Sequence, residues 1–354
     1  MYNICIFDQK LVNYMANDRI NYSNRINEML NMMPGFISDF IYNFGHTEQL
    51  ATKFEYTRDI RDFLQYMVNY MPEHSLKMPK DLSIDDVASV EPMEINRYLT
   101  VLQGTSSSGL KESTLKRRRA TLSSMYSFFI SNGKMTKNPV AATKTIRIPQ
   151  KNLVYLTNDE QRMLLNAVRS GANLSNKAAS LHDQYTDRDS ALFILLLDTG
   201  LRVSEMLSTD IIDYDLDVCS VVVKRKGGDI QTVYYSDECA SYLETYFLSQ
   251  KTKHAILGNE IPAFTTLSGE RLGVRAVENL VKKYVEAALP DKAKIISPHK
   301  LRSSFAMSFY EASNKDILLL QKKLNHKSIT TTNIYAKASD AEVRESRSIL
   351  QGLR

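Results

Sequence analysis

The sequence is poor in cysteine and has no long hydrophobic run. Its three cysteines, Cys5, Cys219 and Cys239, are widely spaced, which excludes a disulfide framework or a cysteine-based zinc cluster and fits a reducing compartment. The longest apolar run, Ala191–Leu197, is far shorter than the roughly 18 residues of a membrane span. The segment Met1–Lys10 lacks a basic region followed by an apolar one. We therefore expect a cytoplasmic protein with no membrane partner.

Motifs of several cofactor-dependent classes are also missing. There is no P-loop, no Rossmann glycine pattern and no nuclease-like carboxylate cluster. His299 and His326 could ligate a metal, but no cysteine or carboxylate ligand pattern accompanies them. We expect neither a metal nor an organic cofactor.

The composition is that of a globular protein. Of the 354 residues, 43% are hydrophobic and 24% are charged, and the formal net charge is +5. The length exceeds that of one ordinary core and suggests two domains. The mild positive charge permits a polyanionic partner without requiring one.

The first part of the chain carries helical periodicity. We expect a partly helical extension over residues 1–45 and a helical domain over 46–145. Within the domain, a helix over Thr114–Asn132 has a basic cluster in its first two turns: Lys116, Arg117, Arg118 and Arg119. Such a run is commonly only a solvated face. Cations at a helix N-terminus oppose the helix dipole, however, and a phosphate ligand could offset that cost. We therefore predict that these four residues face DNA.

A basic linker follows the helical domain. Residues 146–153 read as an extended segment; the basic residue Arg147 lies within it and Lys144 lies just before it. We predict that both contact DNA. The second domain is expected over 154–339, with a tail over 340–354.

The second domain has clear boundaries for its elements. A capping sequence at Thr157 precedes a helix, residues 171–187 read as a polar loop or insertion, and an apolar helix over Arg188–Asp198 ends at Gly200. The pattern predicts a β-hairpin around Gly227-Gly228, the only convincing β-structure. Later helices open at Ser297 and end at Asn325.

Several polar side chains follow these elements. Arg202 begins a short helix after the apolar one, and Lys226 would project from the hairpin. His299 and Arg302 share one helical face near a helix N-terminus, which is a favourable anion site. Taken singly, each has a more common structural explanation, such as an ion-paired arginine or an exposed edge lysine. The same holds for a single pair such as His326 and Tyr335.

Taken together and in order, these residues resemble the catalytic motifs of the tyrosine recombinase/integrase family. The motifs are Thr199–Met206, Lys226-Gly227 in a hairpin, His299–Arg302, and Leu324-Asn325-His326 followed by Tyr335. The similarity covers about residues 155–340 by motif and extends less specifically to 46–140. It is greatest to Xer-type and integrative-element recombinases. Asn325 stands where the family usually has glycine, and Asn is the next-best residue for a left-handed helix end.

The resemblance implies a fold and a mechanism. The fold would be mainly α with a small antiparallel β-sheet, built from a helical core-binding domain and a mixed α/β catalytic domain. Tyr335 would attack a DNA phosphate to form a 3′-phosphotyrosine while Arg202 and Arg302 hold its oxygens. The resemblance assigns proton donation to Lys226, proton handling to His299, and a phosphate hydrogen bond to His326, without a cofactor.

The resemblance also implies partners. The chain would bind a double-stranded DNA recombination site as a tetramer on two sites, formed with itself or with a paralogous recombinase, and the 340–354 tail would dock on a neighbouring protomer. The function would be integration or excision of a mobile element, or chromosome-dimer resolution. The alternatives are a type IB topoisomerase and a non-catalytic DNA-binding regulator of the same fold.

Overall fold

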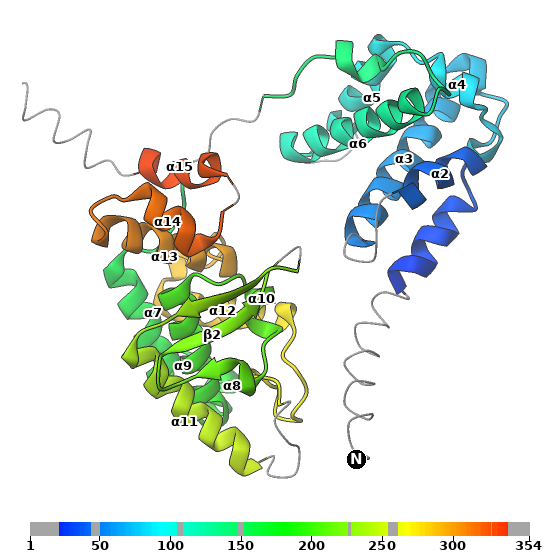
Figure 1. Cartoon of the computed structure of the whole chain (residues 1–354). Helices are drawn as coiled ribbons and strands as arrows, with labels where there is room; N and C mark the ends of the chain where they lie inside the picture. Colours follow the sequence, from blue (N-terminus) through cyan, green and yellow to red (C-terminus); the bar gives the residue numbers. More distant parts are fainter. Residues whose placement is uncertain are drawn as a thin grey trace, which may run out of the picture. The chain divides into compact units, whose positions relative to one another are not determined.

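The chain divides into two compact units, residues 1–150 and 151–354, in the computed structural model of the protein (Figure 1). The structure describes residues 21–43, 50–104, 109–147, 152–225, 228–253, 261–326 and 328–338. Among them no helix is both long enough and apolar enough to span a membrane.

The first unit is helical in its described parts. A helical stretch over residues 21–30 precedes α2, and short 3-10 turns at Pro72–His74, Pro79–Asp81 and Pro139–Ala142 connect the later helices. The helices are α2 (Gly35–Asn43), α3 (Leu50–Tyr70), α4 (Ile84–Ala88), α5 (Pro92–Gly104) and α6 (Glu112–Ser131).

One apolar core joins all of these helices. It holds Phe63 of α3, Tyr98 of α5 and Phe129 of α6, each fully enclosed. Ile26 and Ile37 belong to the same core. The helical unit therefore starts well before the predicted residue 46, because the apolar faces of the first two helices are buried against α3 and α6 rather than forming a separate extension.

A buried carboxylate connects α3 to α6. The side chain of Asp59 on α3 is completely enclosed, forms an ion pair with Arg117, and accepts a 3.0 Å hydrogen bond from the Thr121 hydroxyl. The Arg118 guanidinium lies 3.6 Å from Asp59 and forms a 2.9 Å ion pair with Asp62. A buried charge is tolerated only when it is paired and hydrogen-bonded, so this cluster fixes how the two helices meet.

The second unit combines helices with one small sheet. The helices are α7 (Asn158–Ser170), α8 (Asn176–Ala179), α9 (His182–Thr199), α10 (Val203–Leu207), α11 (Asp237–Lys253), α12 (Val274–Ala288), α13 (Pro298–Ala312), α14 (Ile317–Leu324) and α15 (Ile329–Ala338). The strands are β1 (Tyr214–Asp215), β2 (Ser220–Lys224) and β3 (Ile230–Tyr234), antiparallel in the order β1-β2-β3.

The sheet agrees with the expected hairpin and adds a strand that periodicity did not reveal. β2 and β3 pair in register, with Val222 opposite Thr232. β1 is only two residues long and pairs Tyr214 with Val221. A strand this short shows no alternation of its own, so only the tertiary pairing identifies it.

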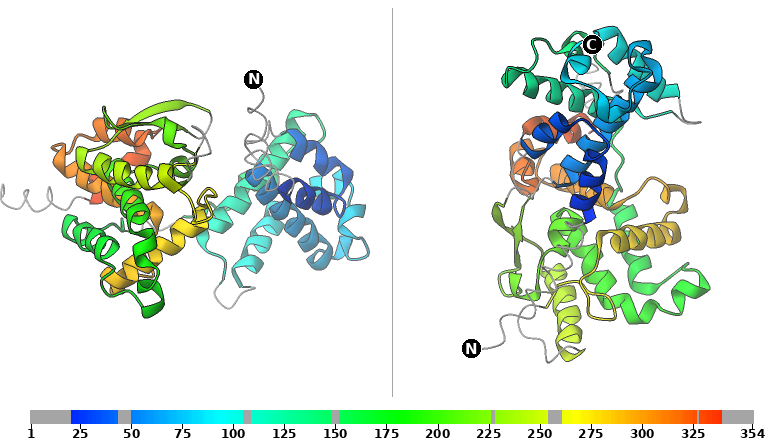
Figure 2. Two further views of the ribbon diagram at one scale, coloured as in Figure 1. Left: turned by 90° about the horizontal axis from the view of Figure 1, so that it is seen from below. Right: turned by 90° about the vertical axis from the view of Figure 1, so that its right-hand side faces the viewer.

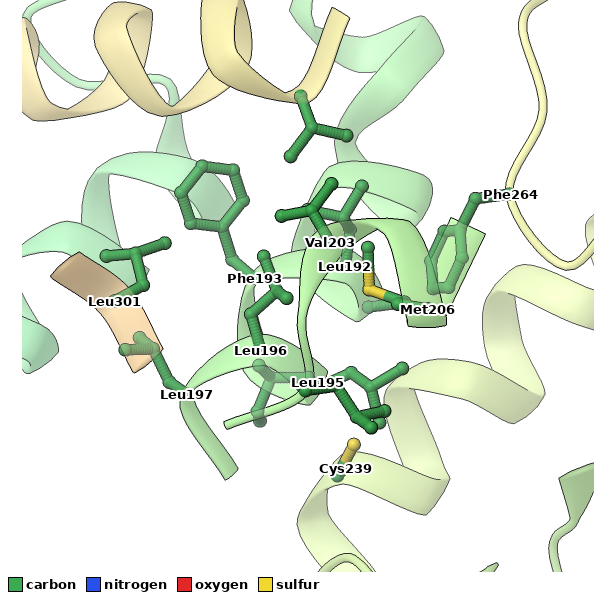
Figure 3. Packing of buried hydrophobic residues seen from close by; sticks show 14 of the residues in the cluster. Leu192, Phe193, Leu195, Leu196, Leu197, Val203, Met206, Cys239, Phe264 and Leu301 are labelled. Atoms are coloured by element: carbon green, nitrogen blue, oxygen red, sulfur yellow. The ribbon is translucent and has the colours of Figure 1, made fainter. Parts of the chain in front are cut away.

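Helix α9 is the centre of the main core. Its residues Leu192, Phe193 and Leu196 belong to a core shared with α7, α11 and α13, and the Phe193 ring meets Tyr284 of α12 edge to face. Figure 3 shows these α9 side chains between Leu301 and Met206. A helix that is apolar on all sides is expected to be surrounded by others. The run that was too short to cross a membrane is thus the central helix of this unit.

Helices α13, α14 and α15 gather at the end of the second unit opposite α11 (Figures 1 and 2). They enclose a second apolar cluster, which includes Phe305, Leu320, Leu324 and Tyr335. This small core sits at the side of the main one and brings the C-terminal elements back to α13.

Helix ends follow the local sequence in most places. Thr157 and Glu160 form the predicted capping box, and Gly200 and Asn325 take left-handed conformations with φ of 61° and 50°. The predicted loop at 171–187 is partly wrong. It contains α8 and the first turns of α9, which begins at His182 because His182 and Tyr284 pack together inside the unit.

These elements confirm the predicted fold class, which is mainly α with a small antiparallel sheet.

We predict that Asp59→Asn lowers the free energy of unfolding by about 3 kcal/mol, because it removes the carboxylate that pairs with Arg117 and Arg118. Chemical denaturation followed by circular dichroism measures this loss. The control is Glu73→Gln, an exposed residue of the same unit, which should change stability by less than about 0.5 kcal/mol. Equal stability of the two variants would contradict the structural role of Asp59.

Candidate active site

Arg302 connects three segments that are distant in sequence. It lies on α13, is only 4% exposed, and donates hydrogen bonds from Nη1 to the Gly200 carbonyl and from Nη2 to the Leu324 carbonyl at 2.7 Å. The first carbonyl lies at the end of α9 and the second at the end of α14. Arg302 thereby holds the start of α10 and the start of the α14–α15 turn against α13.

The two acceptor carbonyls are available for a physical reason. The last carbonyls of a helix have no partner within the helix and carry the negative end of its dipole. The left-handed residues Gly200 and Asn325 turn the chain sharply at these points. At Gly200 a side chain would also collide with the ring of Phe305. Glycine there allows α9 to end directly against α13.

Arg202 lies at the N-terminus of α10 and is much more open than Arg302. Its side chain is 44% exposed and makes a 2.7 Å ion pair from Nη1 to Glu205 Oε1. The backbone N–H of Arg202 donates to Glu205 Oε2 at 3.0 Å. Burial raises the pKa of the Glu205 carboxyl, but the hydrogen bonds from Arg202 and the charges of Arg225 and Arg202 outweigh it, so its pKa lies below the ordinary value.

The two candidate histidines are near both arginines. His299 is exposed in the first turn of α13, and partial burial together with the charges of Lys300, Arg302 and Arg202 lowers its pKa. Burial and the charges of Arg302, Arg202 and His299 lower the pKa of His326 to about 4. Its Nδ1 lies 3.0 Å from the Thr332 hydroxyl. His326 is therefore neutral at pH 7.

Tyr335 lies on α15 and is only 3% exposed. Burial raises the pKa of its phenol, and this effect exceeds the opposing influence of a hydrogen bond with Ser303 and the charge of Arg302. The phenol is therefore protonated at pH 7 and must lose a proton to act as a nucleophile. Tyr335 therefore lies close to Arg302 of its own chain.

The structure brings together five of the predicted catalytic residues: Arg202, His299, Arg302, His326 and Tyr335. The charge of Arg202 or Arg302 influences the pKa of each of His299, Arg302, His326 and Tyr335. The sixth, Lys226, lies outside the described residues, as does the tail over 340–354. Within the described ranges, no group of three or more histidine, cysteine, aspartate or glutamate side chains could hold a metal ion.

The predicted basic cluster on α6 divides into exposed and engaged residues. Arg118 is buried against Asp62 and the Tyr98 hydroxyl, and Arg117 pairs with Asp59. Arg119 donates to the Thr143 hydroxyl at 2.8 Å and to the Val140 carbonyl at 2.8 Å. The expectation that all four side chains face DNA is corrected here, because three of them hold α6 to its own unit.

The other three predicted DNA contacts are exposed to solvent. Lys116, Lys144 and Arg147 are exposed, and they keep their status as candidate DNA contacts.

Glu205 and Arg225 belong to the site, although neither is among the catalytic residues that the motifs predict. Glu205 lies three positions after Arg202, where a side chain can return to the helix start. Arg225 continues the inward alternation of Val221 and Val223 on β2. This two-residue alternation of buried side chains predicts a buried arginine at position 225, beside the hairpin.

Sequence comparison connects most of the chain to known proteins. A model of the phage integrase family matches residues 154–342. The chain is 30% identical over 322 residues to the tyrosine recombinase XerC of Caldanaerobacter subterraneus subsp. tengcongensis, covering 88% of this chain and 86% of that protein. It is 23% identical over 350 residues to the tyrosine recombinase XerS of Streptococcus pneumoniae, covering 91% and 97%.

Solved structures share the fold. The XerH site-specific recombinase bound to a palindromic difH substrate matches with a TM-score of 0.66 and 18% identity, over 93% of this chain and 89% of that one. The Tn1549 transposon integrase in complex with circular intermediate DNA matches with a TM-score of 0.63 and 19% identity, over 86% and 97%.

We predict that the pKa of His326 is about 4 and that Arg202→Met raises it, because Arg202 is one of the charges that disfavour the imidazolium. Nuclear magnetic resonance titration of the imidazole measures both values. The unfolded chain binds the proton more readily between about pH 4 and the ordinary value of 6.5, so the His326 contribution to stability falls as pH falls through this window.

The matched control for this titration is Arg162→Met. Arg162 is an exposed arginine on α7, and its removal should leave the His326 midpoint unchanged. A wild-type midpoint near 6.5 would show that the positive charges do not converge on His326.

Proposed function

This chain belongs to the phage integrase family of tyrosine recombinases, and on that basis we propose that Tyr335 is the nucleophile of its site-specific recombination reaction. The Tyr335 hydroxyl attacks a DNA phosphorus, the bond to the 5′-oxygen breaks, and a 3′-phosphotyrosine forms. The observation that carries this proposal is the position of Tyr335 beside Arg302, which also holds the segments bearing Arg202 and His326.

Arg202 and Arg302 supply the charge that the scissile phosphate requires. Attack on the phosphorus places more negative charge on the nonbridging oxygens, and guanidiniums stay protonated throughout the reaction. Burial and the charge of Arg202 lower the pKa of Arg302 to about 10, with Glu205 opposing, so Arg302 remains charged at pH 7. The bound phosphate thus offsets the repulsion between the two arginines.

The proton of Tyr335 passes to His299 in this mechanism. Because the pKa of His299 is lowered, its ring is neutral at pH 7 and can accept a proton. An anionic phosphate between Arg202 and Arg302 reduces the positive potential at His299 and makes it a better base. His326, also neutral, donates a hydrogen bond to a phosphate oxygen.

Lys226 donates the proton that the departing 5′-oxygen takes up. This role rests on its place after β2 in the chain and on the family resemblance. Reversal of the same steps with a different 5′-hydroxyl rejoins the strands, so no outside energy source is needed.

The substrate is a double-stranded DNA recombination site. Lys116, Lys144 and Arg147 are exposed cations that suit backbone phosphates. One structure of similar fold is a lambda integrase dimer bound to a COC′ core site. This similarity supports DNA as the partner of this chain and the binding of more than one protomer to it. We propose a tetramer on two sites, formed by this chain alone or with a paralogue, acting in the cytoplasm where such DNA lies.

Strand exchange distinguishes a recombinase from a type IB topoisomerase and from a non-catalytic DNA-binding regulator. A type IB topoisomerase would relax supercoils through the same covalent chemistry without exchanging strands. A non-catalytic regulator would bind DNA without any adduct. The set of Arg202, His299, Arg302, His326 and Tyr335 in one place favours catalysis over the regulator.

We predict that wild-type protein forms a covalent adduct with a nicked duplex, and that Tyr335→Phe forms none while binding the same DNA. The nick lets the short cleaved fragment diffuse away, so the phosphotyrosine accumulates. Nicked duplexes tiled across the DNA that flanks the gene serve as substrates, and denaturing gel electrophoresis detects the adduct. The matched control is Tyr234→Phe, an exposed tyrosine on β3, which should react at the wild-type rate.

The outcomes of this trapping experiment separate the alternatives. DNA binding without an adduct from wild type on any substrate favours the regulator. An adduct accompanied by supercoil relaxation, but without joining to a second duplex, favours the topoisomerase. An adduct from Tyr335→Phe would remove Tyr335 from its proposed role.

We further predict that deleting residues 340–354 weakens tetramer assembly on DNA and leaves the affinity of one protomer for a single site unchanged. The segment carries Val343, Ile349 and Leu353 among charged residues, a pattern that suits docking on a neighbouring protomer. Analytical ultracentrifugation with a two-site duplex measures assembly. A full-length variant with serine at these three positions should share the defect, and unchanged tetramer formation by both would contradict the proposal.

A further inference from the structure

Arg225 is a buried arginine that the proposed chemistry does not use. Its guanidinium makes an ion pair from Nη1 to Glu205 Oε2 and a 2.9 Å hydrogen bond from Nε to Gln231 Oε1. Its backbone also closes the base of the hairpin turn, since its N–H donates to the Asp229 carbonyl at 2.7 Å and its carbonyl accepts from the Gly228 N–H at 3.0 Å. A guanidinium is costly to bury, so its position beside Glu205 calls for a reason.

Glu205 divides its two oxygens between two arginines. Oε1 accepts from Arg202 Nη1, whereas Oε2 accepts from the Arg202 backbone and from Arg225 Nη1. An arginine facing a carboxylate with both oxygens free tends to form two parallel hydrogen bonds. With Arg225 Nη1 and the Arg202 backbone N–H both on Oε2, the Arg202 side chain makes a single contact, from Nη1 to Oε1.

We propose that Arg225 is a positioning residue for Arg202: by occupying Glu205 Oε2, it prevents a two-bond pairing of Arg202 with Glu205 and leaves the Arg202 guanidinium free for the scissile phosphate. This inference rests on the proposed function, in which Arg202 binds that phosphate. The 44% exposure of the Arg202 side chain, against 4% for the Arg225 side chain, agrees with one arginine directed at a ligand and the other enclosed.

The charges around Glu205 also indicate that Arg225 has a structural role and Arg202 a ligand-binding one. Arg202, Arg225 and Arg302 surround the single carboxylate of Glu205, and Arg202 and Arg225 each influence the pKa of a neighbouring arginine. Two of these guanidiniums have fixed partners, Glu205 and Gln231 for Arg225 and the two carbonyls for Arg302. A phosphate is the anion that completes the group, and Arg202 is the most open of the three to receive it.

The test compares single-turnover cleavage of two nicked duplexes. One carries the ordinary phosphodiester, and the other carries a methylphosphonate, in which a methyl group replaces one nonbridging oxygen and removes the negative charge. In Arg225→Met, Glu205 Oε2 keeps only the bond from the Arg202 backbone N–H. It can then accept a second bond from the Arg202 guanidinium, which draws that side chain away from the phosphate. We expect about 100-fold slower cleavage of the phosphodiester, the loss typical of a misplaced catalytic group, with DNA affinity unchanged.

The methylphosphonate substrate shows whether the loss of rate in Arg225→Met acts through the contact of Arg202 with the charged phosphate. An uncharged centre depends little on Arg202, so the difference between Arg225→Met and wild type should shrink to less than about tenfold on this substrate. Arg225→Lys keeps a cation beside Oε2 and should restore most of the phosphodiester rate. Lys224→Met removes a neighbouring exposed charge from the same strand and should leave the ratio of the two substrates at its wild-type value.

Each result decides the matter. An equal defect of Arg225→Met on both substrates, or no defect on either, would overturn the inference while leaving the proposed function intact. If Arg225→Met unfolds, the test uses the cleavage rates of Arg225→Lys on the two substrates. A folded Arg225→Lys protein that loses the same factor in rate on both substrates would also overturn the inference. Absence of Tyr335-dependent cleavage by wild type would instead overturn the proposed function and the inference together.

Discussion

The pair of hydrogen bonds from Arg302 to the Gly200 and Leu324 carbonyls is the interaction on which the site depends. One guanidinium satisfies the free carbonyl ends of α9 and α14 and so fixes the segments that follow them. Arg202 follows the first carbonyl and His326 follows the second. The same charge that contacts the phosphate in the proposed mechanism is therefore also the charge that assembles the residues around it.

Buried ions have a different task in each unit. In the first unit, Asp59 gathers Arg117 and Arg118 and joins α3 to α6, so cations that could have faced DNA instead hold the helices together. In the second unit, Glu205 is shared by Arg202 and Arg225, and the sharing leaves one guanidinium open. Both carboxylates are buried, and the difference lies in the exposure of their arginine partners: the Arg118 side chain is 10% exposed, whereas the Arg202 side chain is 44% exposed.

Local sequence signals predicted much of the second unit. The capping box at Thr157, the left-handed ends at Gly200 and Asn325, and the hairpin between β2 and β3 all follow from short patterns that act within a few residues. The start of α9 and the strand β1 did not, because both depend on partners far along the chain. The core role of residues 26–41 was missed for the same reason.

The amino-acid sequence by itself determined the order and identity of the candidate catalytic residues, since residue type and spacing are enough to recognise them. Only the tertiary structure decided which cations are open to a ligand. Arg117 and Arg118 look like surface charges in the sequence, yet each finds a carboxylate from another element. Burial and pairing are properties of the packed chain, and a charge is free or engaged only after the distant partner has been brought beside it.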